Sequence, residues 1–332
     1  MKAKQWLVLG TLGMLACGCN QNKKDEPVVS ERYIHKYGYA LTKEDWDNGN
    51  YPGQVITTLR NGVTITSTYE NGVLHGASTH TFSNSHTVQT YFLYNQGEKV
   101  KEIQYDLQGM PLCETLQVSP TRVTKTLWYA DGTPLSIEEY SQDELLDGQY
   151  FTKNNETESR VEKGNGIRIC YDREGILLSK DEFKGGYMVK RESFYPNNIP
   201  ESIVHFKRGG LHGERKTFTA SGEPLATEDW IDGQLHGKCT YFKNGTKDYE
   251  ISYLKGKKQG SEIHYLDGTA VLKEVIWEND KQHGPSTYFI DGIAQTTWYY
   301  DGKEVSYKEY QDQIKLDEMV SQISTEYHWN NN

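Results

Sequence analysis

Residues 232–245 read Asp-Gly-Gln-Leu-His-Gly-Lys-Cys-Thr-Tyr-Phe-Lys-Asn-Gly, and this stretch decides the fold. Two glycines, Gly233 and Gly237, stand four residues apart, and an Asn-Gly pair ends eight residues after the second of them. Asn-Gly between β-prone runs is the strongest local signal of a hairpin, because both residues tolerate positive φ. The stretch therefore predicts two short strands with a tight turn at Asn244-Gly245 and a wider return turn at Gly233–Gly237.

The same pattern recurs along the chain with a step of 23 or 24 residues, interrupted once by a step of 18 between Gly148 and Gly166. A fixed period of this length indicates a repeat architecture. The repeat turns are predicted at the second glycine of each pair, namely Gly53, Gly76, Gly213, Gly237, Gly260 and Gly284. Glycine is lost at the equivalent positions Val100, Thr124 and Val189.

Aromatic residues keep two fixed offsets from these glycines. Five residues after the glycine position stand Tyr105, Tyr129, Tyr171, Phe194, Phe218, Phe242, Tyr265 and Phe289. Seven residues before it stand Trp46, Tyr69, Phe206, Trp230, Tyr253 and Trp277. In stacked hairpins such residues become cross-strand aromatic columns.

The predicted fold class is therefore all-β. It is an elongated antiparallel meander, or solenoid, of stacked β-hairpin repeats with about 23–24 residues per unit, filling residues 31–302. Residues 38–46 match residues 222–230 in spacing and are expected to form a strand in the same way. The short step at 148–166 is where a bend or break of the array is expected. Residues 303–332 lack the repeat, and Leu316, Val320 and Ile323 have near-helical spacing, which predicts a short C-terminal capping helix and a tail.

Several segments carry a family resemblance. Asn71-Gly-Val-Leu-His-Gly76, Asp232-Gly-Gln-Leu-His-Gly237 and Tyr241–Gly245 resemble the MORN-repeat variant of bacterial proteins often labelled YwqK-family antitoxins. The resemblance covers about residues 38–302, is strongest in 209–292 and is weak in 89–163. It implies a run of β-hairpins in one elongated sheet and an association with toxin operons.

The N-terminus has the plan of a lipoprotein signal peptide over residues 1–19. Lys2 and Lys4 precede a short apolar run, which ends in Leu15-Ala-Cys-Gly-Cys19. This ending resembles a bacterial lipobox, with Cys19 as the lipidated residue and Cys17 as the alternative. Residues 20–30 are polar and fit a flexible tether. Neither candidate cysteine is followed by an acidic residue, and by resemblance to lipoproteins of diderm bacteria this favours outer-membrane delivery, facing the periplasm.

The candidate chemical groups are mostly copies of repeat positions. The histidines His75, His212, His236 and His283 are interpreted as turn residues, because neighbouring units lie about 9.6 Å apart and cannot share one zinc ion. The acids Glu138, Asp181, Glu228, Glu250 and Glu274 are interpreted as one structural position repeated. Cys113, Cys170 and Cys239 are expected to be buried free thiols. The strand arithmetic separates Cys170 and Cys239 too far for a disulfide, and Cys113 occupies a small-residue position of the repeat.

The expected function is a non-catalytic, lipid-anchored envelope scaffold that binds a protein or an envelope polymer. No catalytic residue, metal site or cofactor is predicted, because the sequence has no catalytic or nucleotide-binding motif. The net charge of −10 disfavours nucleic acid as a partner. Two alternatives are an immunity protein that neutralises a toxin, suggested by the resemblance alone, and an envelope hydrolase. The aromatic columns are interpreted as core or, in part, as a stacking surface for a glycan or peptide.

Overall fold

The computed structural model describes residues 27–329, with side chains described as far as Gln322. Residues 1–19, including Cys17 and Cys19, and the first part of the expected tether lie outside the described residues. The predicted fold class is confirmed: 26 strands follow one another as an antiparallel meander, and a helix comes after the last strand. None of the described helices is long and apolar enough to cross a membrane.

The chain divides into two compact units, and the first comprises the residues up to Glu158 together with Arg173–Gly175. In this unit β1 pairs with both β2 and β3, and from β3 to β11 each strand pairs with the next one in sequence. Its elements are β1 (Val28–His35), β2 (Ala40–Leu41), α1 (Lys43–Gly49), β3 (Gly53–Leu59), β4 (Thr64–Glu70), β5 (Val73–Thr81), β6 (Val88–Asn95), β7 (Glu98–Tyr105), β8 (Pro111–Ser119), β9 (Arg122–Trp128), β10 (Pro134–Ser141) and β11 (Glu144–Phe151).

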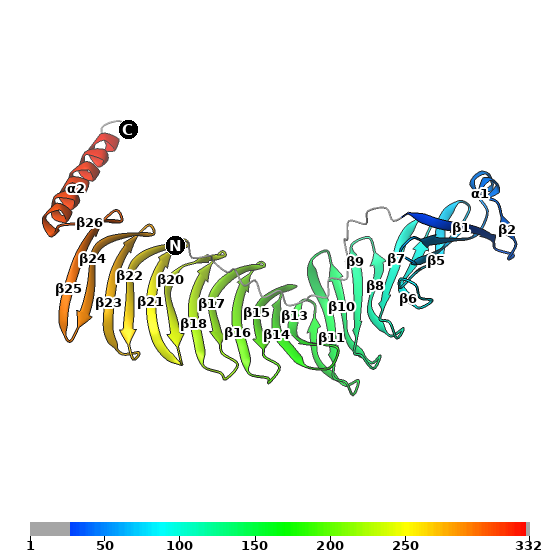
Figure 1. Ribbon diagram of the computed structural model, residues 1–332, viewed down its shortest axis with the longest axis horizontal. Coiled ribbons are helices and arrows are strands. Elements are labelled where there is room, and N and C mark those ends of the chain that lie inside the picture. Colours follow the sequence, from blue (N-terminus) through cyan, green and yellow to red (C-terminus); the bar gives the residue numbers. More distant parts are fainter. Residues whose placement is uncertain (1–26, 330–332) are drawn as a thin grey trace. The chain divides into compact units, whose positions relative to one another are not determined.

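The second unit comprises Ser159–Asp172 and the chain from Ile176 onwards. Its first strand, β12 (Thr157–Glu162), begins within the last two residues of unit 1. The other elements are β13 (Asn165–Tyr171), β14 (Leu177–Lys184), β15 (Tyr187–Phe194), β16 (Pro200–Lys207), β17 (Gly210–Phe218), β18 (Pro224–Ile231), β19 (Gln234–Leu235), β20 (Gly237–Lys243), β21 (Thr246–Leu254), β22 (Lys257–Leu266), β23 (Ala270–Glu278), β24 (Lys281–Ile290), β25 (Ile293–Tyr300), β26 (Lys303–Val305) and α2 (Tyr307–Trp329). Figure 1 shows the strands of each unit following one another in chain order.

The first glycine of the pairs that begin at Gly72, Gly209, Gly233 and Gly256 makes a tight turn, which differs from the expected wide one. Asp232 and Gly233 both have positive φ, at 48° and 78°, and Lys255 and Gly256 repeat this at 51° and 78°. Two consecutive positive φ values define the two-residue type I′ hairpin turn. The expected order of turn types is thus reversed in much of the array, because the wider turns occur at the other ends of the hairpins. There, for example, the N–H of Gly222 donates to the carbonyl of Thr219, and the N–H of Thr219 donates to the carbonyl of Glu223.

The tight turns also connect successive repeats. The N–H of Gly233 donates to the carbonyl of Leu211 at 2.8 Å, and the N–H of Gly256 donates to Leu235 at 2.8 Å. Each donor is the first glycine of one repeat, and each acceptor lies two residues after the first glycine of the preceding repeat. The period of 23 or 24 residues therefore matches the spacing of the backbone hydrogen bonds that link neighbouring hairpins.

The second glycines lie in strands and not in turns. Gly76, Gly213, Gly260 and Gly284 are within β5, β17, β22 and β24, and Gly53 and Gly237 are the first residues of β3 and β20. Each stands opposite an aromatic residue of the neighbouring strand, in the pairs Gly53↔Tyr69, Gly76↔Tyr94, Gly213↔Trp230, Gly237↔Tyr253, Gly260↔Trp277 and Gly284↔Tyr299. Four of these aromatic residues, Tyr69, Trp230, Tyr253 and Trp277, belong to the position seven residues before the next glycine, so the two sequence markers are cross-strand partners.

The N-terminal half-unit differs from the prediction. Residues 38–46 were expected to form a strand, but only Ala40–Leu41 do so, and α1 begins at Lys43. Thr42 caps this helix, because its hydroxyl accepts the N–H of Asp45 at 3.1 Å. Trp46 packs from the helix onto Tyr33 and Tyr69, with ring centres 5.7 and 5.8 Å away. The sheet also starts earlier than expected, since β1 begins at Val28 inside the predicted tether.

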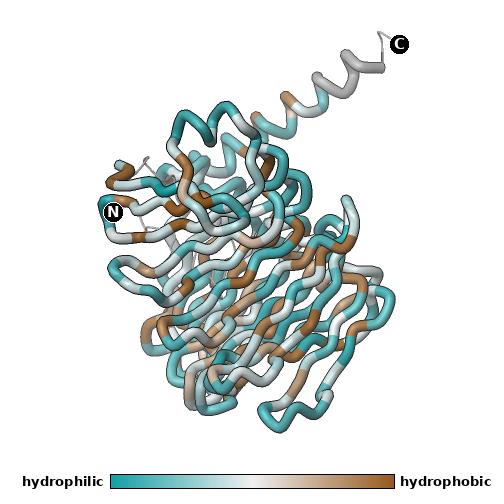
Figure 2. Tube along the Cα trace, turned by 90° about the vertical axis from the view of Figure 1, so that its right-hand side faces the viewer, coloured by the Kyte–Doolittle hydropathy of each residue, from teal (hydrophilic) through white to brown (hydrophobic). Residues whose placement is uncertain are grey.

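The core is thin, as expected of a single sheet. Many strand residues are only half-buried, and polar and apolar residues alternate along the strands, as Figure 2 shows. The C-terminal helix α2 contacts the sheet mainly through its first turn, where Tyr307 and Tyr310 lie 4.7 and 4.9 Å from the ring of Trp298. Farther along the helix, Leu316, Met319 and Val320 are exposed.

Candidate binding surface

A row of stacked rings crosses three neighbouring strands of unit 2. Tyr241, Tyr249 and His264 are successive cross-strand partners in β20, β21 and β22. The ring centres of Tyr241 and Tyr249 are 4.6 Å apart at 18°, and those of Tyr249 and His264 are 5.3 Å apart at 22°. The row continues through Lys273 to Tyr288, whose ring centre lies 4.9 Å from the Lys273 ammonium.

The aromatic residues opposite the second glycines lie on the same face as this row. Lys258 lies 4.2 Å from the ring centre of Trp277 and also bonds Glu262 at 2.9 Å. Glu262 in turn contacts His264 at 2.7 Å. We call this side of unit 2 the aromatic face, and it carries Trp230, Tyr241, Tyr249, Tyr253, His264, Trp277 and Tyr288.

The other expected aromatic column lies on the opposite face. Tyr265 follows His264 in β22, and its hydroxyl donates to Glu250 at 2.8 Å. Because successive residues of a strand point to opposite sides of the sheet, Tyr265 and His264 face different sides. The aromatic residues five positions after the glycine and those seven positions before it therefore lie on opposite faces of the sheet.

Two buried carboxylates hold the aromatic face in place. Glu228 accepts hydrogen bonds from Arg215 at 2.7 Å, from the Trp230 indole at 3.1 Å and from the Tyr241 hydroxyl at 3.3 Å. Burial and the nearby Glu228 charge raise the pKa of Tyr241 well above its ordinary value. Burial opposes ionisation of Glu262, but hydrogen bonds from Lys258 and His264 outweigh it and lower the pKa of Glu262. These contacts fix the rings and satisfy the two buried carboxylates.

The repeated acids are not one structural position. Thr240 stands opposite Thr227 in one neighbouring strand and opposite Glu250 in the other. Glu250 therefore aligns with Thr227, one residue before Glu228, and faces the other side of the sheet. Its partners there are Lys238 at 2.5 Å, Lys247 at 2.7 Å and Tyr265. The expectation fails because a one-residue offset, which is minor in the sequence, reverses the side of a strand.

Asp181 is the most buried acid of unit 2, with no exposed surface. Arg168 in β13 and Arg191 in β15 each bind it through two nitrogens, at distances of 2.8–3.0 Å. Burial alone would raise the pKa of Asp181, but the two guanidinium groups lower it. This cluster of one carboxylate and two guanidinium groups links β13, β14 and β15, and so has a structural role.

Three of the four histidines that were predicted to be turn residues bind backbone groups of the next turn. Nδ1 of His75 accepts the N–H of Gln96 at 3.3 Å, and His212 and His283 accept the N–H groups of Asp232 and Asp301 at 3.5 Å. Within the described residues, no three or more His, Cys, Asp or Glu side chains are placed to bind a metal ion.

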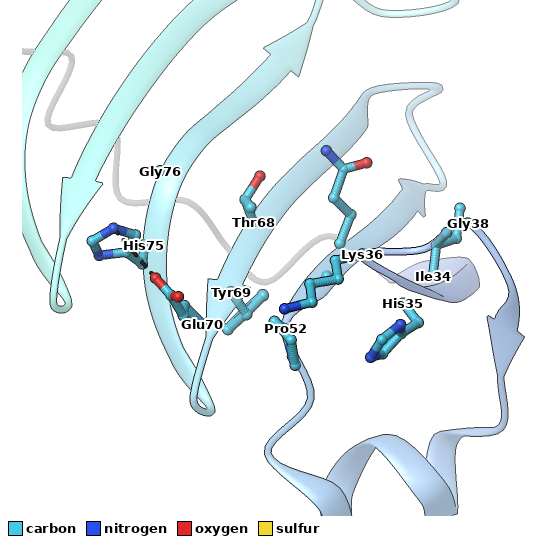
Figure 3. A pocket seen from close by; sticks show the side chains of 12 residues that line it. Ile34, His35, Lys36, Gly38, Pro52, Thr68, Tyr69, Glu70, His75 and Gly76 are labelled. Atoms are coloured by element: carbon cyan, nitrogen blue, oxygen red, sulfur yellow. Dashed lines mark ion pairs between the residues drawn. The ribbon is translucent and has the colours of Figure 1, made fainter.

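An open pocket of about 510 Å3 lies in unit 1, between β1 and the first two glycine positions of the array. It is lined by residues that include His35, Lys36, Glu70 and His75, and Figure 3 shows the ion pair between the last two, 3.5 Å apart. His35 is buried and stacks on Tyr39 with ring centres 4.5 Å apart. The sequence did not indicate this pocket, because Ile34, His35 and Lys36 in its wall precede Gly38, the first residue of the repeat pattern.

The cysteines agree only in part with the expectation. Cys239 is a fully buried free thiol, as expected, whereas Cys170 forms no disulfide but is only half-buried. Cys113 is disulfide-bonded, so the prediction of a free thiol is wrong there. The distance argument considered only pairs among these three cysteines, and the partner of Cys113 is neither of the other two.

Known proteins give no further identification: neither a protein-family model nor a curated protein matches this chain.

Proposed function

We propose that the chain is a lipid-anchored, non-catalytic scaffold of the bacterial envelope, and that it binds another envelope protein through the aromatic face of unit 2. The observation that carries this proposal is the extent of that face, where half-buried rings and paired charges follow one another over β18 to β24. Aromatic residues are enriched at protein interfaces because they supply large contact areas with few rotatable bonds.

The arrangement of the rings favours a protein partner over a glycan. A sugar stacks on the flat face of an aromatic ring, but several of these rings already have a face covered. Tyr249 lies between Tyr241 and His264, and Lys258 and Lys273 lie over Trp277 and Tyr288. The surface thus offers ring edges, hydroxyl groups and ammonium groups, which suit the mixed polar and apolar surface of a protein.

The membrane part of the proposal is supported by the N-terminal sequence, with Cys19 or Cys17 as the anchor. Radiolabelled palmitate is expected to enter the wild-type chain and not a Cys17→Ala/Cys19→Ala double variant. Equal labelling of both, or labelling of neither, would remove the anchor from the proposal.

The binding surface is tested by crosslinking in intact cells that express the anchored chain, followed by identification of the attached molecules. Tyr288 is 45% exposed, and the variant Tyr288→Ala/Lys273→Ala should lose the crosslinked protein. Leu272→Ala is the matched control, because Leu272 is exposed in the same region but is not one of the residues of the aromatic face. Capture of an envelope polymer alone, or equal capture by both variants, would contradict the proposal.

A further inference from the structure

The last long strand of unit 2 has an open edge. β25 pairs along its whole length with β24, but on its other side β26 pairs only with Trp298, Tyr299 and Tyr300. No described strand pairs with the outer side of Ile293–Thr297, and Ile293 to Thr296 are exposed. This segment therefore presents a five-residue row of backbone donors and acceptors at the edge of the sheet.

Natural edge strands are usually protected against pairing by charges, prolines or bulges. β25 has none of these: its sequence is Ile-Ala-Gln-Thr-Thr-Trp-Tyr-Tyr, and its seven pairs with β24 contain no register shift. The four preceding long pairings, from β20–β21 to β23–β24, all contain a shift. The edge is thus regular and uncharged at the place where protection is most needed.

The first strand of the array provides a contrast within the same chain. β1 also has an open stretch before Tyr33, but it carries a register shift between Val28 and Ser30 and the charged residues Glu31 and Arg32. One terminal strand therefore has the features that prevent strand addition, and the other lacks them.

We propose that two copies of this chain associate through β25, by antiparallel pairing of Ile293–Thr297 about a two-fold axis at Gln295. In this register Ile293 of one copy lies opposite Thr297 of the other, Ala294 lies opposite Thr296, and Gln295 lies opposite itself. If the two-fold axis lay closer to Trp298, the second copy would collide with β26. If it lay closer to Ile293, residues at the Thr297 end of the open segment would remain unpaired. The strand is self-complementary in this register, because no charged residue lies opposite a like charge.

The proposal is tested on the full chain in detergent by light scattering after size exclusion. The wild type is expected to be a dimer. Gln295→Lys and Gln295→Glu, each alone, should be monomers, because the two-fold axis places like charges opposite each other. When the two variants are mixed, the dimer should return, since Lys then lies opposite Glu. The matched control is Leu272→Lys, an exposed position on a strand paired on both sides, which should remain a dimer.

Recovery in the mixture also shows that both variants are folded. A monomeric wild type would overturn the proposal, and so would a Gln295→Lys variant that stays dimeric. A dimer that is instead lost in Met319→Lys would place the contact on α2 and overturn it as well. Failure of the mixed variants to associate would exclude the register centred on Gln295.

Discussion

Gly260 stands directly opposite Trp277 in the β22–β23 pair. The φ of Gly260 is 93°, and the Lys258 ammonium covers the Trp277 ring at a distance of 4.2 Å. Gly260 thus adopts a left-handed backbone conformation directly opposite a large aromatic residue. The same pairing occurs at the other second glycines of the array, which explains why the glycine and the aromatic residue recur together.

Gly260→Ala should lower the free energy of unfolding by about 1–2 kcal/mol, which is the typical cost of a left-handed conformation in a residue with a Cβ. Space is a minor factor, because the nearest side-chain atom to the added Cβ would be 3.5 Å away. The measurement is urea unfolding followed by tryptophan fluorescence. Gly210→Ala is the control, because Gly210 has no positive φ and an added Cβ would meet nothing closer than 3.7 Å. Equal effects of the two substitutions would refute the role assigned to φ.

Asp181→Asn should be strongly destabilising, by roughly 3–5 kcal/mol, because it leaves two buried guanidinium groups without a counter-charge. Arg168 and Arg191 are only 13% and 17% exposed, so water cannot replace the lost carboxylate well. Thermal unfolding of the variant and of Glu201→Gln, a change at an exposed acid, provides the comparison. A shift no larger than that of the control would show that the cluster contributes little.

Stability should fall in acid as Glu250 is protonated. Burial opposes the charge of Glu250, but Lys238, Lys247 and Tyr265 outweigh it and lower its pKa to about 2. Since the pKa is lower in the folded chain than the ordinary value of about 4.3, this contribution is complete above that value. It is lost as the pH falls toward 2. The difference in melting temperature between the wild type and Glu250→Gln should therefore shrink between pH 5 and pH 2, whereas a constant difference would argue against the ion cluster.

Cys239 should be unreactive in the native protein. Burial raises the pKa of its thiol to about 11, and the side chain has no exposed surface. At pH 8 the thiolate fraction is then on the order of 0.001, and the thiolate is the reactive form. Alkylation with iodoacetamide, followed by peptide mass spectrometry, should modify Cys239 slowly until urea is added. Native and unfolded chains that react at the same rate would disprove this burial.

The repeat period, the all-β class and the helix at the C-terminus could be predicted, because each rests on local residue patterns. Asp232-Gly233 and Asn244-Gly245 both mark turns, but the width of each turn depends on hydrogen bonds that form only when the flanking strands pair. The strand predicted at residues 38–46 failed for a similar reason. Its spacing matches 222–230, yet Thr42 begins a helix there, and Trp46 packs on Tyr33 and Tyr69 from that helix.

The candidate surface was less accessible to sequence reasoning. Glu228 and Glu250 appear equivalent when counted from the glycines, but the register places them on opposite faces. The pocket beside His35 and His75 joins residues 40 positions apart, one of them outside the repeat.

The sequence by itself determined that this chain is an array of hairpins, because positive-φ residues at a fixed spacing leave the backbone few other conformations. Only the tertiary structure decided which side of the sheet each side chain faces, since each bulge changes the alternation of a strand and the sequence does not mark bulges. It also decided that the second glycines lie opposite aromatic residues, and that β25 has an open edge at Ile293–Thr297. These properties depend on which residues lie opposite one another, and that is settled when the strands pair.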